Sequence, residues 1–154
     1  RYMDALIGQP DEKGLRRAYL STGPKAIDYF RAKSAVRFVP SGKHPDYRDM
    51  DGAAVTGRAL APEGFDGRLL GRDFERVRPP IPEFMVLGGM MAGKNDIPKL
   101  IGRFRSLGNF AYSGKLFLRY LLDRLRYSRG TRLVMGNALV ARLYYSLKQI
   151  GVPG

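Results

Sequence analysis

A histidine, an acid and a phenol stand close together in the stretch His44-Pro45-Asp46-Tyr47, where the proline restricts the backbone. A phenol with an ordinary pKa of about 10 is a poor base at neutral pH unless a positive charge or a partner phenolate lowers that pKa. Arg48 and Arg58 are close enough in the sequence to supply positive charge. Tyr47 is therefore a candidate for proton transfer, although a tyrosine that only anchors a loop fits the same pattern. His44, the only histidine, either shares this task or is an ordinary loop residue.

Several other kinds of chemistry are excluded by the residues that the sequence lacks. The chain has no cysteine, which excludes disulfides, thiolate metal sites and cysteine nucleophiles. A single histidine cannot form a paired-histidine zinc site, so we expect no metal. No phosphate-binding loop, dinucleotide fingerprint or Gly-x-Ser-x-Gly elbow is present. The glycines at 67, 71, 88 and 89 are therefore interpreted as turn residues.

The candidate residues lie in a long stretch, Pro40 to Gly93, that has no helical periodicity and is dense in glycine and proline. A loop of this length inside a compact chain is usually functional or disordered, and we interpret it as functional. Short extended segments are expected at 53–60 and 84–87. Four aromatic residues are expected to anchor the stretch by packing inward, namely Tyr47, Phe65, Phe74 and Phe84.

Apolar residues at helical spacing on both sides of this stretch predict helices. We expect the end of a helix at 2–7, a helix at 11–20, a break at 21–24 and a new helix from Pro24, then a short strand at 36–39. After the irregular stretch we expect a helix from Asn95 or Asp96, one that Gly130 closes, and a last one at 137–150. The predicted fold is mainly α, with five or six helices, a long irregular Gly/Pro-rich insert at about 40–93 and one or two short strands, in a single helical segment 1–154.

The same spacing predicts which side chains are buried. In the helix before Gly130, the leucines recur at i, i+3, i+4 and i+7 and should face inward, with Asp123 on the opposite, solvent-facing side. The side chains expected to point inward are Leu15, Ala18, Tyr19, Ala26, Ile27, Phe30, Leu100, Ile101, Phe104, Leu118, Leu121, Leu122, Leu125, Leu139, Leu143, Leu147 and Ile150.

The charge of the chain is concentrated near its C-terminal end. The formal net charge is +13, and the residues from Ile97 onward hold eleven lysines and arginines against one acid, a net charge of +10. Such a field attracts nucleic acid, anionic lipid or an acidic partner, but a solvated basic face is the more ordinary interpretation. The tyrosines of this region lie at helical spacing, which favours packing over base stacking.

The length and the ends of the chain bear on its organisation. The 154 residues, 44% of them hydrophobic, suffice for one domain with a core. No apolar run approaches the ~18 residues of a bilayer-spanning helix, and a cytoplasmic location is expected. The chain begins at Arg1, directly before a helical pattern, and ends on Gly-Val-Pro-Gly. Both ends look cut, which predicts a piece of a larger protein.

Short segments spread over nearly the whole chain resemble, in order, the FAD-dependent 3-ketosteroid dehydrogenases and their relatives in the fumarate reductase/succinate dehydrogenase flavoprotein superfamily. The ordered series carries the resemblance, since each segment alone is a weak motif. The segments are Tyr2-Met-Asp-Ala-Leu-Ile-Gly, Ala26-Ile-Asp-Tyr-Phe, Val36-Arg-Phe, Pro45-Asp-Tyr, Gly57-Arg-Ala-Leu-Ala-Pro, Phe65-Asp-Gly-Arg-Leu-Leu-Gly, Gly136-Asn-Ala-Leu-Val-Ala-Arg-Leu and Gly151-Val-Pro.

The resemblance implies roles for individual residues. By match of the Pro-Asp-Tyr motif, Tyr47 is the catalytic tyrosine, which works with a second tyrosine from a capping domain. His44 takes the place of a usually aromatic residue that touches substrate, and Arg48 stands where a second tyrosine is common. Arg58 is expected to be scaffold. No cofactor-binding residue is assigned.

The resemblance also implies a function and partners. This chain would be a fragment of a larger α/β FAD-binding enzyme whose dinucleotide-binding βαβ unit and capping domain are both absent here. The enzyme would dehydrogenate a 3-ketosteroid-like small molecule next to its ketone, by proton abstraction and hydride transfer to FAD. The fragment would be inactive alone, without bound FAD, and would pack against the remainder of its own chain. A basic helical module that binds nucleic acid or another polyanion is the alternative, with nucleic acid an improbable partner.

Overall fold

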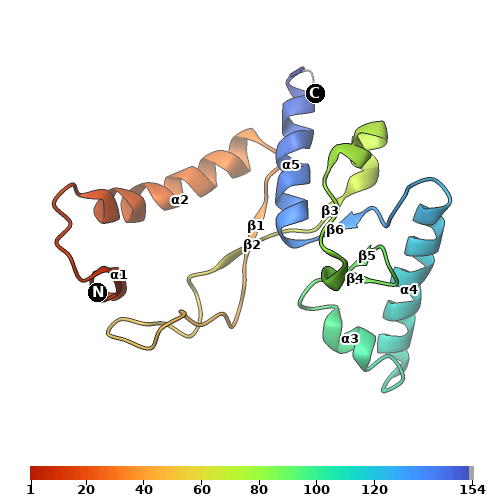
Figure 1. Ribbon diagram of the computed structural model, residues 1–154, viewed down its shortest axis with the longest axis horizontal. Helices are drawn as coiled ribbons and strands as arrows, with labels where there is room; N and C mark the ends of the chain where they lie inside the picture. The colour runs from red at the N-terminus through yellow and green to blue at the C-terminus, as the bar shows by residue number, and fades with distance from the viewer. Residues whose placement is uncertain (153–154) are drawn as a thin grey trace. The chain divides into compact units, whose positions relative to one another are not determined.

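The computed structural model of the chain describes residues 1–152 and divides at Pro62 into two units, the first of residues 1–62 and the second from Glu63 onward. The boundary falls inside the stretch expected to be a single irregular insert. Figure 1 follows the elements of both units along the chain by colour. Within residues 1–152, no helix combines the length and the apolar character that crossing a bilayer requires.

Unit 1 consists of two helices and one antiparallel ribbon. Helix α1 spans Tyr2–Ile7, α2 spans Leu15–Lys33, and strand β1 (Phe38–Pro40) pairs with β2 (Leu60–Pro62). The register places Val39 opposite Ala61. The observed strand begins two residues later and ends one residue later than the predicted strand at 36–39, and the predicted extended segment at 53–60 leads into β2. The ribbon positions the loop of residues 41–59, which holds the candidate site.

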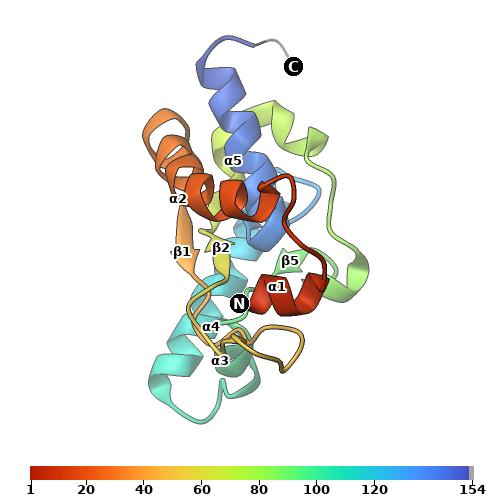
Figure 2. The same cartoon turned by 90° about the vertical axis from the view of Figure 1, so that its left-hand side faces the viewer.

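The predicted break at 21–24 is wrong, because α2 continues through Pro24 as one helix (Figure 2). A proline inside a helix removes one hydrogen bond and costs about 3 kcal/mol, which weakens a helix without always ending it. Here the hydroxyls of Ser21 and Thr22 donate to the carbonyl of Ala18, so they bond within the helix instead of opening a turn. The predicted inner stripe of α2 is also wrong, since none of its residues is buried.

Unit 2 contains three helices and two short ribbons. The helices are α3 (Ile97–Ile101), α4 (Leu107–Arg124) and α5 (Met135–Gln149), preceded by the 3₁₀ helices η1 (Gly67–Arg76) and η2 (Pro82–Phe84). Strand β3 (Phe65–Asp66) pairs with β6 (Arg132–Leu133), and β4 (Met85–Val86) pairs with β5 (Met90–Met91). The described residues therefore contain five α-helices, as predicted, but three ribbons where one or two strands were expected.

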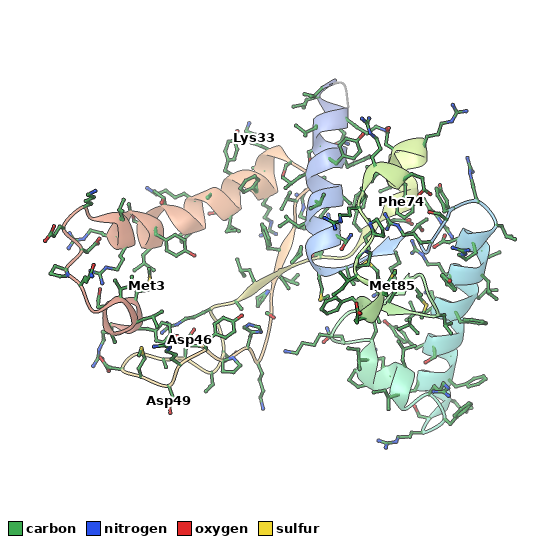
Figure 3. The ribbon with its side chains drawn as sticks, in the orientation of Figure 1. Met3, Lys33, Asp46, Asp49, Phe74 and Met85 are labelled. Atoms are coloured by element: carbon green, nitrogen blue, oxygen red, sulfur yellow. The ribbon has the colours of Figure 1, made fainter. Side chains whose placement is uncertain are left out.

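The core of unit 2 forms where η1, the β3–β6 ribbon and α5 meet. Phe65 and Phe74 are buried there, as predicted, and Phe74 is labelled in Figure 3. Phe84 is 56% exposed, so its predicted anchoring role is wrong, and Tyr47 in unit 1 is not an anchor either. The buried residues of this cluster are Phe65, Leu70, Phe74, Val77, Met91, Leu133, Val134, Ala138 and Ala141.

The predicted inward faces of the helices in unit 2 are largely wrong. The α4 leucines expected to be buried are exposed, and Leu125, just beyond the helix, is 83% exposed. The buried positions of α4 are Ser113, Tyr120 and Asp123, the last of which was predicted to face solvent. The buried positions of α5 are Ala138 and Ala141. Further residues expected inside are exposed, namely Ile101, Phe104, Leu143, Leu147 and Ile150.

Candidate active-site loop

The loop of residues 41–59 continues the β1–β2 ribbon as a braced hairpin. The backbone N–H of Ser41 donates to the carbonyl of Ala59 at 2.9 Å, and the Thr56 hydroxyl donates to the carbonyl of Gly42 at 2.9 Å. Lys43 and Thr56 form an antiparallel bridge. The two arms of the loop are therefore held together up to the residue before His44.

Asp46 fixes the tip of the loop from the inside. Its backbone N–H donates to the carbonyl of Ala54 at 2.9 Å, and its Oδ2 accepts from the Ala54 N–H at 2.8 Å. The same oxygen lies 3.0 Å from a guanidinium nitrogen of Arg58, and the carboxylate side chain is only 15% exposed. The residue directly before Tyr47 is thus tied to the opposite arm by three contacts.

Arg58 connects the loop to helix α1. Its guanidinium also donates to the carbonyl of Gly52 and lies 5.1 Å from the centre of the Tyr2 ring. The Tyr2 hydroxyl accepts from the backbone N–H of Arg48 at 3.4 Å. Gly52 approaches α1 so closely that an added Cβ would lie 2.7 Å from the backbone nitrogen of Tyr2. These contacts support the scaffold role that the sequence resemblance implies for Arg58.

Tyr47 and His44 stand together on the solvent side of this loop. Tyr47 is 95% exposed, and its ring lies edge-on to the imidazole of His44, with 6.4 Å between centroids and 87° between planes. The structure therefore brings together the predicted phenol and histidine. The predicted acid, Asp46, does not join this pair, because its carboxylate points inward and contacts Arg58. The Tyr47 phenol is therefore accessible from solvent.

Two carboxylates in unit 2 are buried and accept several hydrogen bonds, which the sequence did not predict. Asp123 accepts from Arg68 at 2.5 and 2.8 Å and from both the N–H and the hydroxyl of Thr131 at 2.8 Å. Asp96 accepts from Tyr112 at 2.5 Å and from Arg132 at 2.7 Å. The one available signal for Asp123 was its position as the lone acid among eleven cations.

The surroundings of Asp96 make the stability of the fold depend on pH. Burial alone would raise the pKa of Asp96, but hydrogen bonds from Tyr112, the Gly93 N–H and Arg132 outweigh it and lower the pKa below the usual 3.8. A carboxylate with a lowered folded-state pKa stabilises fully above its unfolded pKa and loses this contribution as the pH falls through the folded value.

We therefore expect Asp96→Asn to reduce the free energy of unfolding most at neutral pH. The gap to the parent chain should be full well above pH 3.8, the usual pKa, and should narrow as the pH falls below that value through the lowered pKa of folded Asp96. Urea unfolding at a series of pH values measures this gap, and Asp28→Asn on exposed helix α2 is the control. A gap that stays constant over this range would contradict the assignment.

Some of the lysines and arginines in the last third of the chain form ion pairs within the fold. Four of its eleven cations reach acids that precede residue 97. Arg119 lies 2.8 Å from Asp66, and Arg132 lies 2.7 Å from Asp96. The other two pairs are Arg142 with Glu63 and Lys148 with Asp73. The tyrosines 112, 120, 127, 144 and 145 are buried or half-buried, as helical spacing predicted.

Two kinds of site, a parallel βαβ unit and a metal-holding cluster of side chains, are not found among the described residues. Their strands form three separate antiparallel pairs, so residues 1–152 include no parallel βαβ unit of the kind that binds dinucleotides. Among the same residues, no three histidine, cysteine or acidic side chains gather in a way that could hold a metal ion.

Comparisons with known proteins connect the chain to ketone dehydrogenases. It is 35% identical over 135 residues to a 4-oxocyclohex-2-ene-1-carboxylate 5-dehydrogenase of Sinomonas cyclohexanicum, matching 87% of this chain and 23% of the relative. It is 30% identical over 158 residues to a 3-oxosteroid 1-dehydrogenase of Mycolicibacterium smegmatis, matching 99% of this chain and 26% of the relative. No protein-family model matches the chain.

A solved structure agrees with these relatives. The crystal structure of 3-ketosteroid delta1-dehydrogenase from Sterolibacterium denitrificans, in complex with 1,4-androstadiene-3,17-dione, is 28% identical and superposes with a TM-score of 0.71. The match covers 88% of this chain and 25% of that one. The chain thus spans about a quarter of the length of the relatives it matches. The predicted resemblance is confirmed: the chain is similar to an internal segment of 3-ketosteroid dehydrogenases.

Proposed function

We propose that this chain is a segment of an FAD-dependent dehydrogenase that removes two hydrogens from adjacent carbons beside a ring ketone, in a 3-ketosteroid-like substrate. The observation that carries the proposal is the braced loop, which holds the Tyr47 phenol outward beside His44. The relatives, which are named as dehydrogenases of ring ketones, support this reading.

The reaction needs a proton acceptor and a hydride acceptor. A proton leaves the carbon next to the ketone, a hydride leaves the neighbouring carbon, and the electron pair of the broken C–H bond becomes the new double bond. Bound flavin supplies the hydride acceptor. Tyr47 would donate its hydroxyl hydrogen bond at the site of proton removal. If the acceptor is the hydroxyl of a second tyrosine, this hydrogen bond favours the charged phenolate form of that tyrosine. The pKa of the second tyrosine is thereby lowered, which makes it a usable base.

The flavin would be held by parts of the protein outside this chain, since residues 1–152 provide no βαβ unit. The chain would accordingly be inactive alone. The apolar side chains that α2 and α4 leave exposed, such as Tyr19, Leu118 and Leu122, would pack against the remainder of the same protein. Such packing would explain why α2 and α4 have apolar faces that are exposed among the described residues.

The proposal is tested by turnover in the full-length protein. We expect that protein, supplied with a cyclic ketone and an artificial electron acceptor, to release a product two hydrogens lighter, while the 154-residue chain gives none. Mass spectrometry of the product measures this directly. A folded full-length protein that takes up no FAD and changes no ring ketone would show the proposal to be wrong.

A further inference from the structure

We propose that Arg58 is a positioning residue for Tyr47, which sets the turnover rate by fixing the backbone on both sides of the phenol. This inference rests on the proposed function, because it concerns the proton step assigned to Tyr47. Tyr47 is 95% exposed, so packing around its own ring restricts it little. Its orientation therefore depends on the residues directly before and after it, Asp46 and Arg48.

The residue before Tyr47 is fixed by the guanidinium of Arg58. The Oδ2 atom of Asp46 lies 3.0 Å from Nη1 of Arg58, and the same oxygen accepts from the Ala54 N–H at 2.8 Å. The Asp46 side chain is 15% exposed, so this ion pair is screened less by salt than a fully exposed one. Nη2 of Arg58 donates to the carbonyl of Gly52. The two nitrogens thus hold Asp46 and the backbone at Gly52 in one arrangement.

The residue after Tyr47 is fixed through Tyr2 of helix α1. The backbone N–H of Arg48 donates to the Tyr2 hydroxyl at 3.4 Å. Arg58 lies against the same tyrosine, with its Cζ atom 5.1 Å from the ring centroid. At this distance the face of an aromatic ring attracts a cation. One guanidinium therefore contacts Asp46 directly and reaches the backbone of Arg48 through a single intervening ring.

These contacts depend on the shape of the guanidinium and not only on its charge. A planar fork can donate to an acid and to a carbonyl while its face lies on an aromatic ring, whereas a lysine ammonium is a point charge on a flexible stem. The charge of Arg58 is also paired with that of Asp46, which weakens its field at other groups. Arg58→Lys, which keeps the charge and loses the fork, should therefore release Tyr47 from its position.

The test combines Arg58→Lys with Tyr47→Phe in the full-length protein, by steady-state turnover of a cyclic ketone with an artificial electron acceptor. Arg58→Lys alone should lower kcat about 10-fold or more, because misplacing a reacting group by about 1 Å can cost as much as 10²-fold. Flavin content and KM should not change. In the Tyr47→Phe background, Arg58→Lys should alter kcat by less than about 2-fold, since the hydroxyl that it positions is already absent.

Arg37→Lys is the matched control for Arg58→Lys. It removes the same planar fork from another arginine of unit 1, which donates to the carbonyls of Ser34 and Val36 outside the loop. We expect this variant to keep the wild-type kcat in both backgrounds.

An Arg58→Lys loss that is equal in the two backgrounds would overturn this inference, because a purely structural effect does not depend on the Tyr47 hydroxyl. An unchanged kcat in Arg58→Lys would overturn it as well. In both cases the dehydrogenase function stands. A wild-type protein without flavin and without turnover would instead overturn the proposed function, and this inference with it.

Asp46→Asn provides a second test if Arg58→Lys loses its flavin. This change keeps an oxygen that can accept from the Ala54 N–H and removes the charge that holds Arg58. Asp46→Asn should lower kcat when the Tyr47 hydroxyl is present and leave it unchanged in Tyr47→Phe. Equal losses in the two backgrounds, or no loss in either, would contradict the positioning role.

Discussion

Tyr47→Phe in the full-length protein is expected to lower kcat for ketone dehydrogenation by about 10²- to 10⁴-fold, the usual contribution of a positioned proton-transfer group. The change removes one hydroxyl from a side chain that is 95% exposed, so the fold should not depend on it. Flavin content and the unfolding temperature should therefore match those of the wild type. Steady-state turnover with an artificial electron acceptor measures the effect.

Tyr29→Phe is the matched control for this experiment, because it removes the same hydroxyl from an exposed tyrosine on α2. We expect that variant to keep the wild-type kcat. If Tyr47→Phe behaves like Tyr29→Phe, Tyr47 is an exposed residue without a chemical role. If Tyr47→Phe loses flavin, its effect on turnover is structural and the proposed role in proton transfer is wrong.

Asp123→Ala is expected to lower the free energy of unfolding by about 1–3 kcal/mol, the cost of leaving buried hydrogen-bond donors without their acceptor. The Asp123 side chain is 1% exposed and lies within 4.0 Å of both Arg68 and Arg119. Its removal also leaves the N–H of Thr131 without its acceptor in a buried position. Urea unfolding of the 154-residue chain measures the loss.

Glu83→Gln provides the comparison for Asp123→Ala, since Glu83 is an exposed acid of the same unit. A surface substitution of this kind should change the free energy of unfolding by at most about 0.5 kcal/mol. An Asp123→Ala loss no larger than this would mean that Asp123 faces solvent, as helical periodicity alone suggested.

Asp123 also shows what sequence reasoning could not reach. Leucine spacing in α4 correctly predicted a helix, but it placed Asp123 on the exposed face and the leucines inside. Helical periodicity identifies the apolar face of a helix, but it does not show which part of the protein packs against that face. The burial of Asp123 depends on Arg68, 55 positions away, and a lone sequence contains no signal for that pairing.

The candidate site was more predictable from the sequence than the hydrophobic core of unit 2. The turn residues of 41–49 predicted an irregular loop, and Tyr47 and His44 do lie side by side. The bracing of the loop was not predictable, because it comes from Asp46 bonding to Ala54 and Arg58 across the hairpin. Pro24 was read as a helix break from a local rule that the longer α2 overrides.

The proposed flavin-dependent dehydrogenation is tested most directly by anaerobic mixing of the purified full-length protein with a cyclic ketone while its visible absorbance is recorded. We expect flavin absorbance in the purified protein and its rapid loss on adding the ketone, with a much slower loss in Tyr47→Phe. A protein without flavin, or one whose flavin stays oxidised with acidic and steroidal ketones alike, would contradict it.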